Sequence, residues 1–375
     1  MKNINQNKIK SIIWAIALTI LCSLLTIFSA SYVKNIKNKR DNNIEQTISV
    51  TKNDAFASTN EFVKKIVNKL QPKEVKTGIF LDRISNFDML QSKWQFEYYQ
   101  WFKWNPKKIE FTDLQELEKG IISIQSAPFQ VVNGEIEKIE ISGFDINEAG
   151  DSAYVNYLIK ASSSNFFDVS DFPLDRQLLL INIEHKDLDV SELKFIPDSS
   201  LTHVSPRVSI NSYLIGDVYN LTKINTYKSD FGYRSEDEYA SSYSQYRFGL
   251  LIKREGYNYY FKLLIILLII LSISFLSFFA SDNDKIRIAT GCLFAATASY
   301  YFYGSKIPPT SKITILELVY AISLIIIFII TLQETVLKSI VGKNEKLYNN
   351  IRWITFIITI LFFIGFNYLI PSLLS

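Results

Sequence analysis

Five aromatic side chains and several carboxylates gather within residues 227–243. The aromatic residues are Tyr227, Phe231, Tyr233, Tyr239 and Tyr243, and the acidic residues among them include Asp230, Glu236 and Asp237. Aromatic faces flanked by carboxylates suit an ammonium group or another organic cation. The same composition also fits the packed edge of a β-sheet, and both interpretations stay open at this point.

A second unusual segment is an apolar stretch built largely from small and hydroxyl residues. Within 285–305 these are Ala289, Thr290, Gly291, Ala295, Ala296, Thr297 and Ser299, whereas the neighbouring stretches are dominated by Ile, Leu and Phe. A helix surrounded by other helices and by water tolerates such residues, while a lipid-facing helix has no need of them. The segment therefore suggests a pore-forming helix or a tightly packed helix in a bundle without a pore.

Metal and enzyme chemistry find little support. The two cysteines, Cys22 and Cys292, both lie in apolar stretches, and His185 and His203 are isolated. No cysteine-based or histidine-based metal site is expected from such a set. We find no phosphate-binding loop or nucleophile motif, so we expect no cofactor, no metal and no enzymatic activity.

The elements that position these residues include several membrane spans. Four uncharged runs follow one another at 263–281, 288–305, 318–333 and 353–375, and a fifth covers 11–33. Each is close to the roughly 20 residues with which a helix crosses about 30 Å of hydrocarbon. The sequence therefore predicts an integral membrane protein.

Basic residues set the expected topology. The connection after the run 318–333 carries Lys338, Lys343, Lys346 and Arg352, which predicts a cytoplasmic location. Counting back places the large domain, and the connection 306–312, outside the cell membrane. Residues 1–10 are then a cytoplasmic tail, and 11–33 is either a retained anchor or a cleaved signal sequence. Its length and the basic flank after Lys34 favour the anchor.

The charge is divided unevenly along the chain. Residues 41–253 carry 31 acidic and 23 basic side chains, whereas the remainder carries 6 and 17. An acidic domain argues against nucleic acid as a partner and favours attraction of cations. Alternatively, both signs serve only solubility and membrane topology.

The segment between the first run and the membrane bundle predicts mainly strands. Residues 34–74 form a linker whose part 52–71 fits an amphipathic helix. Beyond it the apolar period changes to two, in short runs separated by turn-rich breaks. The expected strands are Val75–Ile84, Lys93–Trp104, Ile136–Ser142, Ala153–Ala161, Gln177–Glu184 and Arg247–Arg254. This pattern predicts an antiparallel β-sandwich.

One segment carries a recognisable pattern, which reads Asn165-Phe-Phe-Asp-Val-Ser-Asp-Phe-Pro-Leu-Asp-Arg-Gln-Leu-Leu179. It resembles the signature loop of the pentameric ligand-gated ion channels, the Cys-loop receptor superfamily, with its core Phe-Pro-x-Asp-x-Gln. Asn165 and Leu179 stand where animal members have cysteines. The chain is in this respect similar to the bacterial branch, in which apolar packing replaces the disulfide.

Further matches follow in the family's order. They are the segment 75–88, Trp101-Phe-Lys-Trp104, Lys253-Arg254 before Tyr259-Tyr260, Pro308-Pro309, Glu317 and, loosely, Phe366-Asn367. The resemblance implies an all-β, immunoglobulin-like extracellular domain over 75–256. It also implies a four-helix transmembrane pore domain over 257–375, with the N-terminal hydrophobic helix as an additional element.

The resemblance also implies sites. Ligand-binding residues would be Phe231, Tyr233, Tyr239 and Tyr227, with Phe102 or Trp104 on the partner subunit's face. Pore-lining residues would be Ile288, Cys292, Ala295, Ser299 and Phe302, with Phe302 as a hydrophobic constriction. Coupling between domain and pore would use a pair between Asp175 and Arg254, together with Phe172, Pro173 and Pro308.

The expected function is a homopentameric ion channel in the inner membrane that opens when a small-molecule agonist binds. It would pass monovalent ions, and the acidic domain favours cations. Two departures from the family matter. Ala295 replaces a leucine-like gate residue, and 257–281 lacks a proline. These departures permit an alternative, a non-conducting sensor or assembly protein of the same fold, in contact with lipid. A membrane enzyme or transporter is a third alternative, but the spans carry no charged residue except Glu317 near an end.

Overall fold

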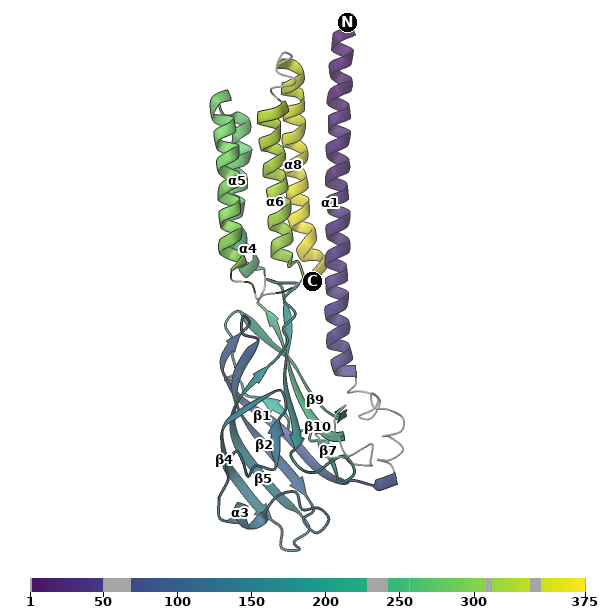
Figure 1. Ribbon diagram of the computed structural model, residues 1–375, viewed down its shortest axis with the longest axis vertical. Coiled ribbons are helices and arrows are strands. Elements are labelled where there is room, and N and C mark those ends of the chain that lie inside the picture. The colour runs from purple at the N-terminus through teal and green to yellow at the C-terminus, as the bar shows by residue number, and fades with distance from the viewer. Residues whose placement is uncertain are drawn as a thin grey trace. The chain divides into compact units, whose positions relative to one another are not determined.

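The structure is a computed structural model, and it describes residues 2–49, 69–227, 242–255, 257–305, 307, 310, 312–337 and 345–374. The chain divides into two compact units. A helical unit comprises residues 1–40, 168–175 and 255–375, and a strand unit comprises 41–167 and 176–254. Figure 1 labels their helices and strands. The predicted ligand residues Phe231, Tyr233 and Tyr239, the predicted coupling residue Pro308 and most of the expected helix 52–71 lie outside the described residues.

The first sheet of the strand unit is mixed. Its strand order is β4-β5-β2-β1-β7, with β8 also paired to β1. Strand β1 pairs antiparallel with β2 but parallel with both β7 and β8. The expectation of a purely antiparallel arrangement was therefore wrong at this edge, because β7 and β8 return to β1 in its own direction. The strands are β1 Lys73–Asp88, β2 Lys93–Trp104, β4 Gly134–Ile146, β5 Ala153–Ser164, β7 Leu193–Pro197 and β8 His203–Val204.

The second sheet is antiparallel throughout, with the order β3-β6-β10-β9. Its strands are β3 Phe129–Val131, β6 Arg176–His185, β9 Tyr213–Thr226 and β10 Ser242–Arg254. The six predicted strands are confirmed as parts of β1, β2, β4, β5, β6 and β10, whereas β3, β7, β8 and β9 were not predicted. A short helix, α3 (Leu114–Glu118), begins at Asp113, whose side chain accepts hydrogen bonds from two backbone amides of its first turn.

Aromatic rings fill the core of the strand unit. The alternating burial along β2 and β5 puts every second side chain inside, as a half-buried strand requires. Phe102 of β2 contacts Phe129 of the second sheet with a ring-centroid distance of 5.1 Å, and Tyr157 of β5 contacts the same Phe129 at 5.4 Å. Side chains from both sheets thus share one core.

The helical unit contains long helices at the predicted apolar runs. They are α1 Lys2–Ser49, α4 Asn258–Leu276 (followed by the 3₁₀ turn η1 Ser277–Phe279), α5 Asp282–Gly304, α6 Ile315–Leu332 (followed by the π-helical turn η2 Gln333–Leu337) and α8 Glu345–Leu374. Helix α6 begins at a capping box, in which Thr314 and Glu317 satisfy each other's backbone amides.

Four of the described helices, α1, α4, α6 and α8, are long and apolar enough to cross a membrane. The chain is accordingly a membrane protein. Helix α5 is not among the four, although the run 288–305 was predicted as a span. Its length is 23 residues, so its small and hydroxyl side chains, and not its length, set it apart from the other helices.

Candidate functional site

Helix α5 buries one stripe against the other helices of its unit. The buried side chains are Lys285, Ala289, Cys292, Ala296, Ser299 and Tyr303. They follow one another at spacings of three or four, so they share one helix face. The Ser299 hydroxyl lies 3.0 Å from the Tyr320 hydroxyl of α6, which ties this face to its neighbour.

The five residues predicted to line a pore do not form one open stripe in the single chain. Cys292 and Ser299 are buried, Ile288 is half-buried, and Ala295 and Phe302 are exposed. The family resemblance implied all five as pore-lining, on one helical stripe. In the single chain these positions straddle the border between the packed and the open side of α5, and their place in a pore stays a prediction.

The loop at 168–175 is hydrogen-bonded to the start of α6. The backbone amides of Ile315 and Leu316 donate to the carbonyl oxygens of Ser170 and Phe172, at 3.1 and 3.2 Å. The first amides of a helix have no partner within the helix, so the loop satisfies two of them. In addition, Lys312 Nζ lies 2.6 Å from Asp168 Oδ2. The loop and α6 therefore form one connected structure.

Phe172 and Pro173 belong to this loop at 168–175. Both are buried, the peptide bond between them is cis, and the Phe172 ring contacts Tyr259 next to the start of α4 at a centroid distance of 6.2 Å. Burial of Asp168 opposes ionisation, but hydrogen bonds from Lys312 and Ser170 outweigh it and lower the pKa of Asp168. The role of Phe172 and Pro173 in coupling stays a prediction.

The base of the loop is closed by polar contacts. Asn165 is buried and its Oδ1 accepts hydrogen bonds from Trp94 Nε1 at 3.2 Å and from Ser163 Oγ at 2.9 Å. Its Nδ2 donates across the base to the Leu178 carbonyl at 3.4 Å. The expected apolar replacement of a disulfide is thus corrected on the Asn165 side, where an amide network holds the ends. Leu179 on the other side is buried, as expected.

Asp175 and Arg254 are both buried, but they belong to different units. Their pairing stays a prediction. Within the strand unit, an Arg254 guanidinium nitrogen donates to the Tyr213 hydroxyl at 2.5 Å and contacts the Met89 sulfur at 3.2 Å. The guanidinium also lies 4.5 Å from the Tyr213 ring centroid. Sequence reasoning missed Tyr213 as the residue that positions Arg254.

A buried carboxylate lies beside the described part of the aromatic segment. Glu184 of β6 is fully buried and accepts hydrogen bonds from Tyr227, Asn225 and Gln245 at 2.8, 2.9 and 2.8 Å. Burial, together with the Glu184 hydrogen bond and charge, raises the pKa of Tyr227 to about 12. The Tyr227 ring meets the Tyr243 ring edge to face at 6.0 Å. Two half-buried aromatic rings thus lie beside one buried carboxylate.

Trp104 does not join this cluster. Its side chain is buried and packs on Phe111 with a centroid distance of 5.2 Å. The end of β2 turns this ring into the core of the single chain, and the role of Trp104 on a neighbouring subunit's face stays a prediction.

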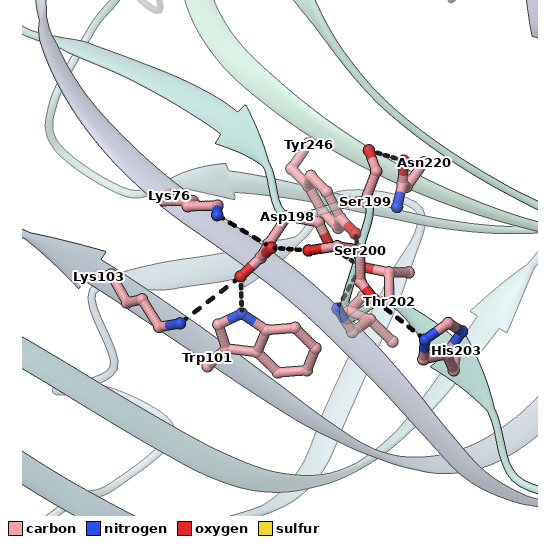
Figure 2. A network of polar contacts seen from close by, with 11 residues as sticks. Lys76, Trp101, Lys103, Asp198, Ser199, Ser200, Thr202, His203, Asn220 and Tyr246 are labelled. Atoms are coloured by element: carbon pink, nitrogen blue, oxygen red, sulfur yellow. Dashed lines mark hydrogen bonds and ion pairs between the residues drawn. The ribbon is translucent and has the colours of Figure 1, made fainter.

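A polar network around Asp198 joins β1 and β2 to the segment after β7 (Figure 2). The buried Asp198 carboxylate accepts from Trp101 Nε1 at 3.2 Å and lies 3.1 Å from Lys76 Nζ and 3.6 Å from Lys103 Nζ. Burial opposes ionisation, but the hydrogen bonds from Lys76 and Trp101 prevail and lower the pKa of Asp198. The Trp101 ring lies where a Cβ on Gly78 would come within 2.3 Å of it. The Trp101 motif therefore serves the architecture of the sheet.

Among the described residues, no group of three or more His, Cys, Asp or Glu side chains could hold a metal ion. Neither a protein-family model nor a curated protein matches the chain.

Proposed function

We propose that the chain is the subunit of a homopentameric ligand-gated ion channel, with the two sheets forming an immunoglobulin-like extracellular domain and α4, α5, α6 and α8 forming the pore domain. The sequence resemblance over 75–375 motivates the proposal. The channel would lie in a bacterial inner membrane with the strand unit outside.

One observation carries the proposal. Residues 168–175 are continuous with β5 and β6 of the strand unit through their flanking residues, yet they group with the helical unit. Two of their carbonyl oxygens accept hydrogen bonds from the first residues of α6. A loop held in this way can transmit a change in the sheets to the helices, which is the requirement for a channel opened by a ligand.

Helix α5 supports the pore. It is the helix with small, hydroxyl and glycine residues, and it leaves one side unburied by its own chain, where Ala295 and Phe302 are exposed. In a ring of five subunits the open sides would face a shared axis and the neighbouring copies. Phe302 would then form a hydrophobic constriction that gates by dewetting.

The agonist in this proposal is a small organic cation. Tyr227 and Tyr243 offer aromatic faces next to the buried Glu184 charge, and Phe231, Tyr233 and Tyr239 follow on the same segment. Aromatic rings attract ammonium groups over their faces, by about 0.5 to 2 kcal/mol for each favourable contact. The acidic strand unit would raise the local concentration of cations, both agonist and permeant monovalent ions.

The alternative is a non-conducting sensor with the same fold. It is favoured by Ala295, which offers only a methyl group on the open side of α5, and by the burial of Cys292 and Ser299. Such a protein would pass the signal from the strand unit to a partner without opening a pore.

Reconstitution separates the two functions. Purified protein is first counted by native mass spectrometry in detergent and then placed in liposomes loaded with sodium. A pentamer that releases sodium on addition of an organic cation supports the channel, and a pentamer that never releases it supports the sensor. A stable monomer would overturn both.

A further inference from the structure

Helix α1 buries one continuous stripe within the helical unit. The buried residues are Ser11, Leu18, Cys22, Ser29, Val33, Ile36 and Arg40. They recur at spacings of three, four or seven residues, which place them on one face of a helix. Several are small, as is typical where helices approach closely in a membrane.

The opposite face of α1 is exposed and mainly aliphatic over residues 9–27. It carries Ile9, Ile13, Ile16, Ile20, Leu24 and Ile27, at the same helical spacing but half a turn away. A helix with a small-residue stripe on one face and large aliphatic residues on the other suits a position between other helices and lipid. The segment thus has two distinct faces, whereas a signal sequence requires only overall hydrophobicity.

Side-chain hydrogen bonds fix α1 at two levels of its unit. Trp14 Nε1 donates to the Thr355 hydroxyl of α8 at 3.0 Å. Tyr32 donates to the Ile313 carbonyl just before α6 at 2.7 Å. In Figure 1, α1 runs alongside α6 and α8 within the helical unit. Helix α1 therefore contacts α8 through Trp14 in its first half and the start of α6 through Tyr32 further along.

The last buried residue of the stripe contacts the loop at 168–175. Arg40 Nη1 lies 2.7 Å from Asp171 Oδ2, and the two side chains are only 4% and 1% exposed. The neighbouring residues of Asp171, Ser170 and Phe172, are the ones whose carbonyl oxygens cap α6. Arg40, Asp171 and the start of α6 therefore form one chain of contacts from α1 to α6.

We propose that residues 2–49 are retained in the mature protein as a fifth membrane-spanning helix, and that Arg40 of this helix is a positioning residue that holds the loop 168–175 on α6. Helix α1 is continuous through Phe28, Ser29 and Ala30, which match the small-residue cleavage site of a signal sequence poorly. Cleavage after Ala30 would remove four of the seven buried stripe residues, Ser11, Leu18, Cys22 and Ser29, together with the Trp14–Thr355 hydrogen bond. An effect of Arg40 on channel opening rests on the proposed function, but the docking of α1 does not.

The docking is tested by cross-linking in full-length protein in which Cys22 and Cys292 are replaced by Ser. The pair Tyr32→Cys and Ile313→Cys is treated with a short bis-maleimide in membranes and digested, and cross-linked peptides are identified by mass spectrometry. Ser31→Cys with Ile313→Cys is the matched control, because Ser31 is exposed and points away from the stripe. We expect a cross-link for the first pair and none for the control. Equal yields would overturn the docking of α1, and purified protein that begins after residue 30 would overturn the retained helix.

The contact by which Arg40 holds the loop 168–175 through Asp171, the clamp, is tested by hydrogen exchange in detergent at pH 8. Arg40→Ala is compared with Lys39→Ala, whose side chain is exposed on the same turn. A charge-assisted hydrogen bond contributes enough that we expect exchange within 168–175 to accelerate about tenfold or more in Arg40→Ala only. Equal exchange in both variants would overturn the clamp.

The outcomes also separate the clamp from the proposed function. If Arg40→Ala does not accumulate while Lys39→Ala does, Arg40→Lys is measured in its place. If residues 168–175 of Arg40→Lys then exchange as slowly as in the unmodified chain or in Lys39→Ala, a specific role for the guanidinium is overturned. A cross-link and a protected loop in a protein that never conducts would refute only the channel.

Discussion

The backbone amide of Leu316 donates to the carbonyl of Phe172 at 3.2 Å, although 144 residues separate them in the chain. Together with the bond from Ile315 to Ser170, it makes the loop part of the cap of α6. A backbone contact of this kind depends on the conformation of the loop and not on one side chain. Phe172 and Pro173 are both buried within this loop, so their packing supports that conformation.

Phe172→Ala should therefore destabilise the helical unit. The ring is buried beside Tyr259, and removing a buried phenylalanine costs about 3 to 5 kcal/mol. Thermal unfolding of the purified protein measures the loss. Phe166→Ala is the control, since Phe166 is 88% exposed and should change little. Equal shifts in both variants would mean that the loop is not packed as described.

Tyr227→Phe should weaken the cluster at Glu184 by about 1 to 3 kcal/mol, because a buried carboxylate loses one of its three side-chain donors. Urea unfolding followed by tryptophan fluorescence measures the change. Tyr219→Phe removes a hydroxyl whose bond to Asp217 is long, at 3.4 Å, and should leave stability unaltered. If Tyr227→Phe is as stable as the unmodified chain, the hydroxyl does not serve the carboxylate.

The stability of the helical unit should depend on pH through Asp171. Burial and the nearby Asp175 charge raise the pKa of Asp171 to about 7, although Arg40 opposes the shift. A raised carboxyl pKa favours the protonated form in the folded chain. Its contribution to stability is therefore complete below the ordinary carboxyl pKa of about 4 and is lost as pH rises through about 7.

We accordingly expect the free energy of unfolding to fall by about 1 to 4 kcal/mol between pH 5 and pH 8. Asp171→Asn, which keeps an acceptor for Arg40 and cannot ionise, should flatten this dependence. Thermal unfolding across the pH series checks both statements. A dependence that persists undiminished in Asp171→Asn would assign the titration to another group.

The burial pattern of α5 predicts which positions water reaches in the proposed pore. In protein with Cys292→Ser, cysteines placed at Ala295 and Phe302 should react quickly with a charged thiol reagent, because both positions are exposed. A cysteine at Ser299 should react far more slowly, because Ser299 is buried against Tyr320. Modification rates by mass spectrometry give the comparison. Faster reaction at Ser299 would restore the face inferred from the sequence.

Local pattern was sufficient for much of the fold. The period of two in Lys93–Trp104 predicted β2 at its observed limits, and the apolar runs predicted the long helices. The five-residue strand β7 was missed because it is short, ends at Pro197 and pairs parallel with β1. Such a pairing depends on the path of the chain and leaves no periodic signal.

The site was less predictable because its contacts join residues far apart in sequence. The signature segment pointed to Phe172 and Asp175, but nothing local linked Arg40 to Asp171 across 131 residues. The family resemblance placed Cys292 and Ser299 on one stripe with Ala295, and helical periodicity gives such a stripe without saying which side packs. The indole of Trp101 was singled out by its motif, yet its partner Asp198 could be found only in three dimensions.

Current recording from cells that express the chain tests the channel most directly. Small organic cations are applied while the sodium gradient is varied, and surface protein is quantified in parallel. We expect agonist-dependent currents whose reversal potential follows the sodium gradient and whose gating changes in Phe302→Ala. Pentamers at the surface that pass no current under any of these conditions would contradict this expectation and leave the non-conducting sensor.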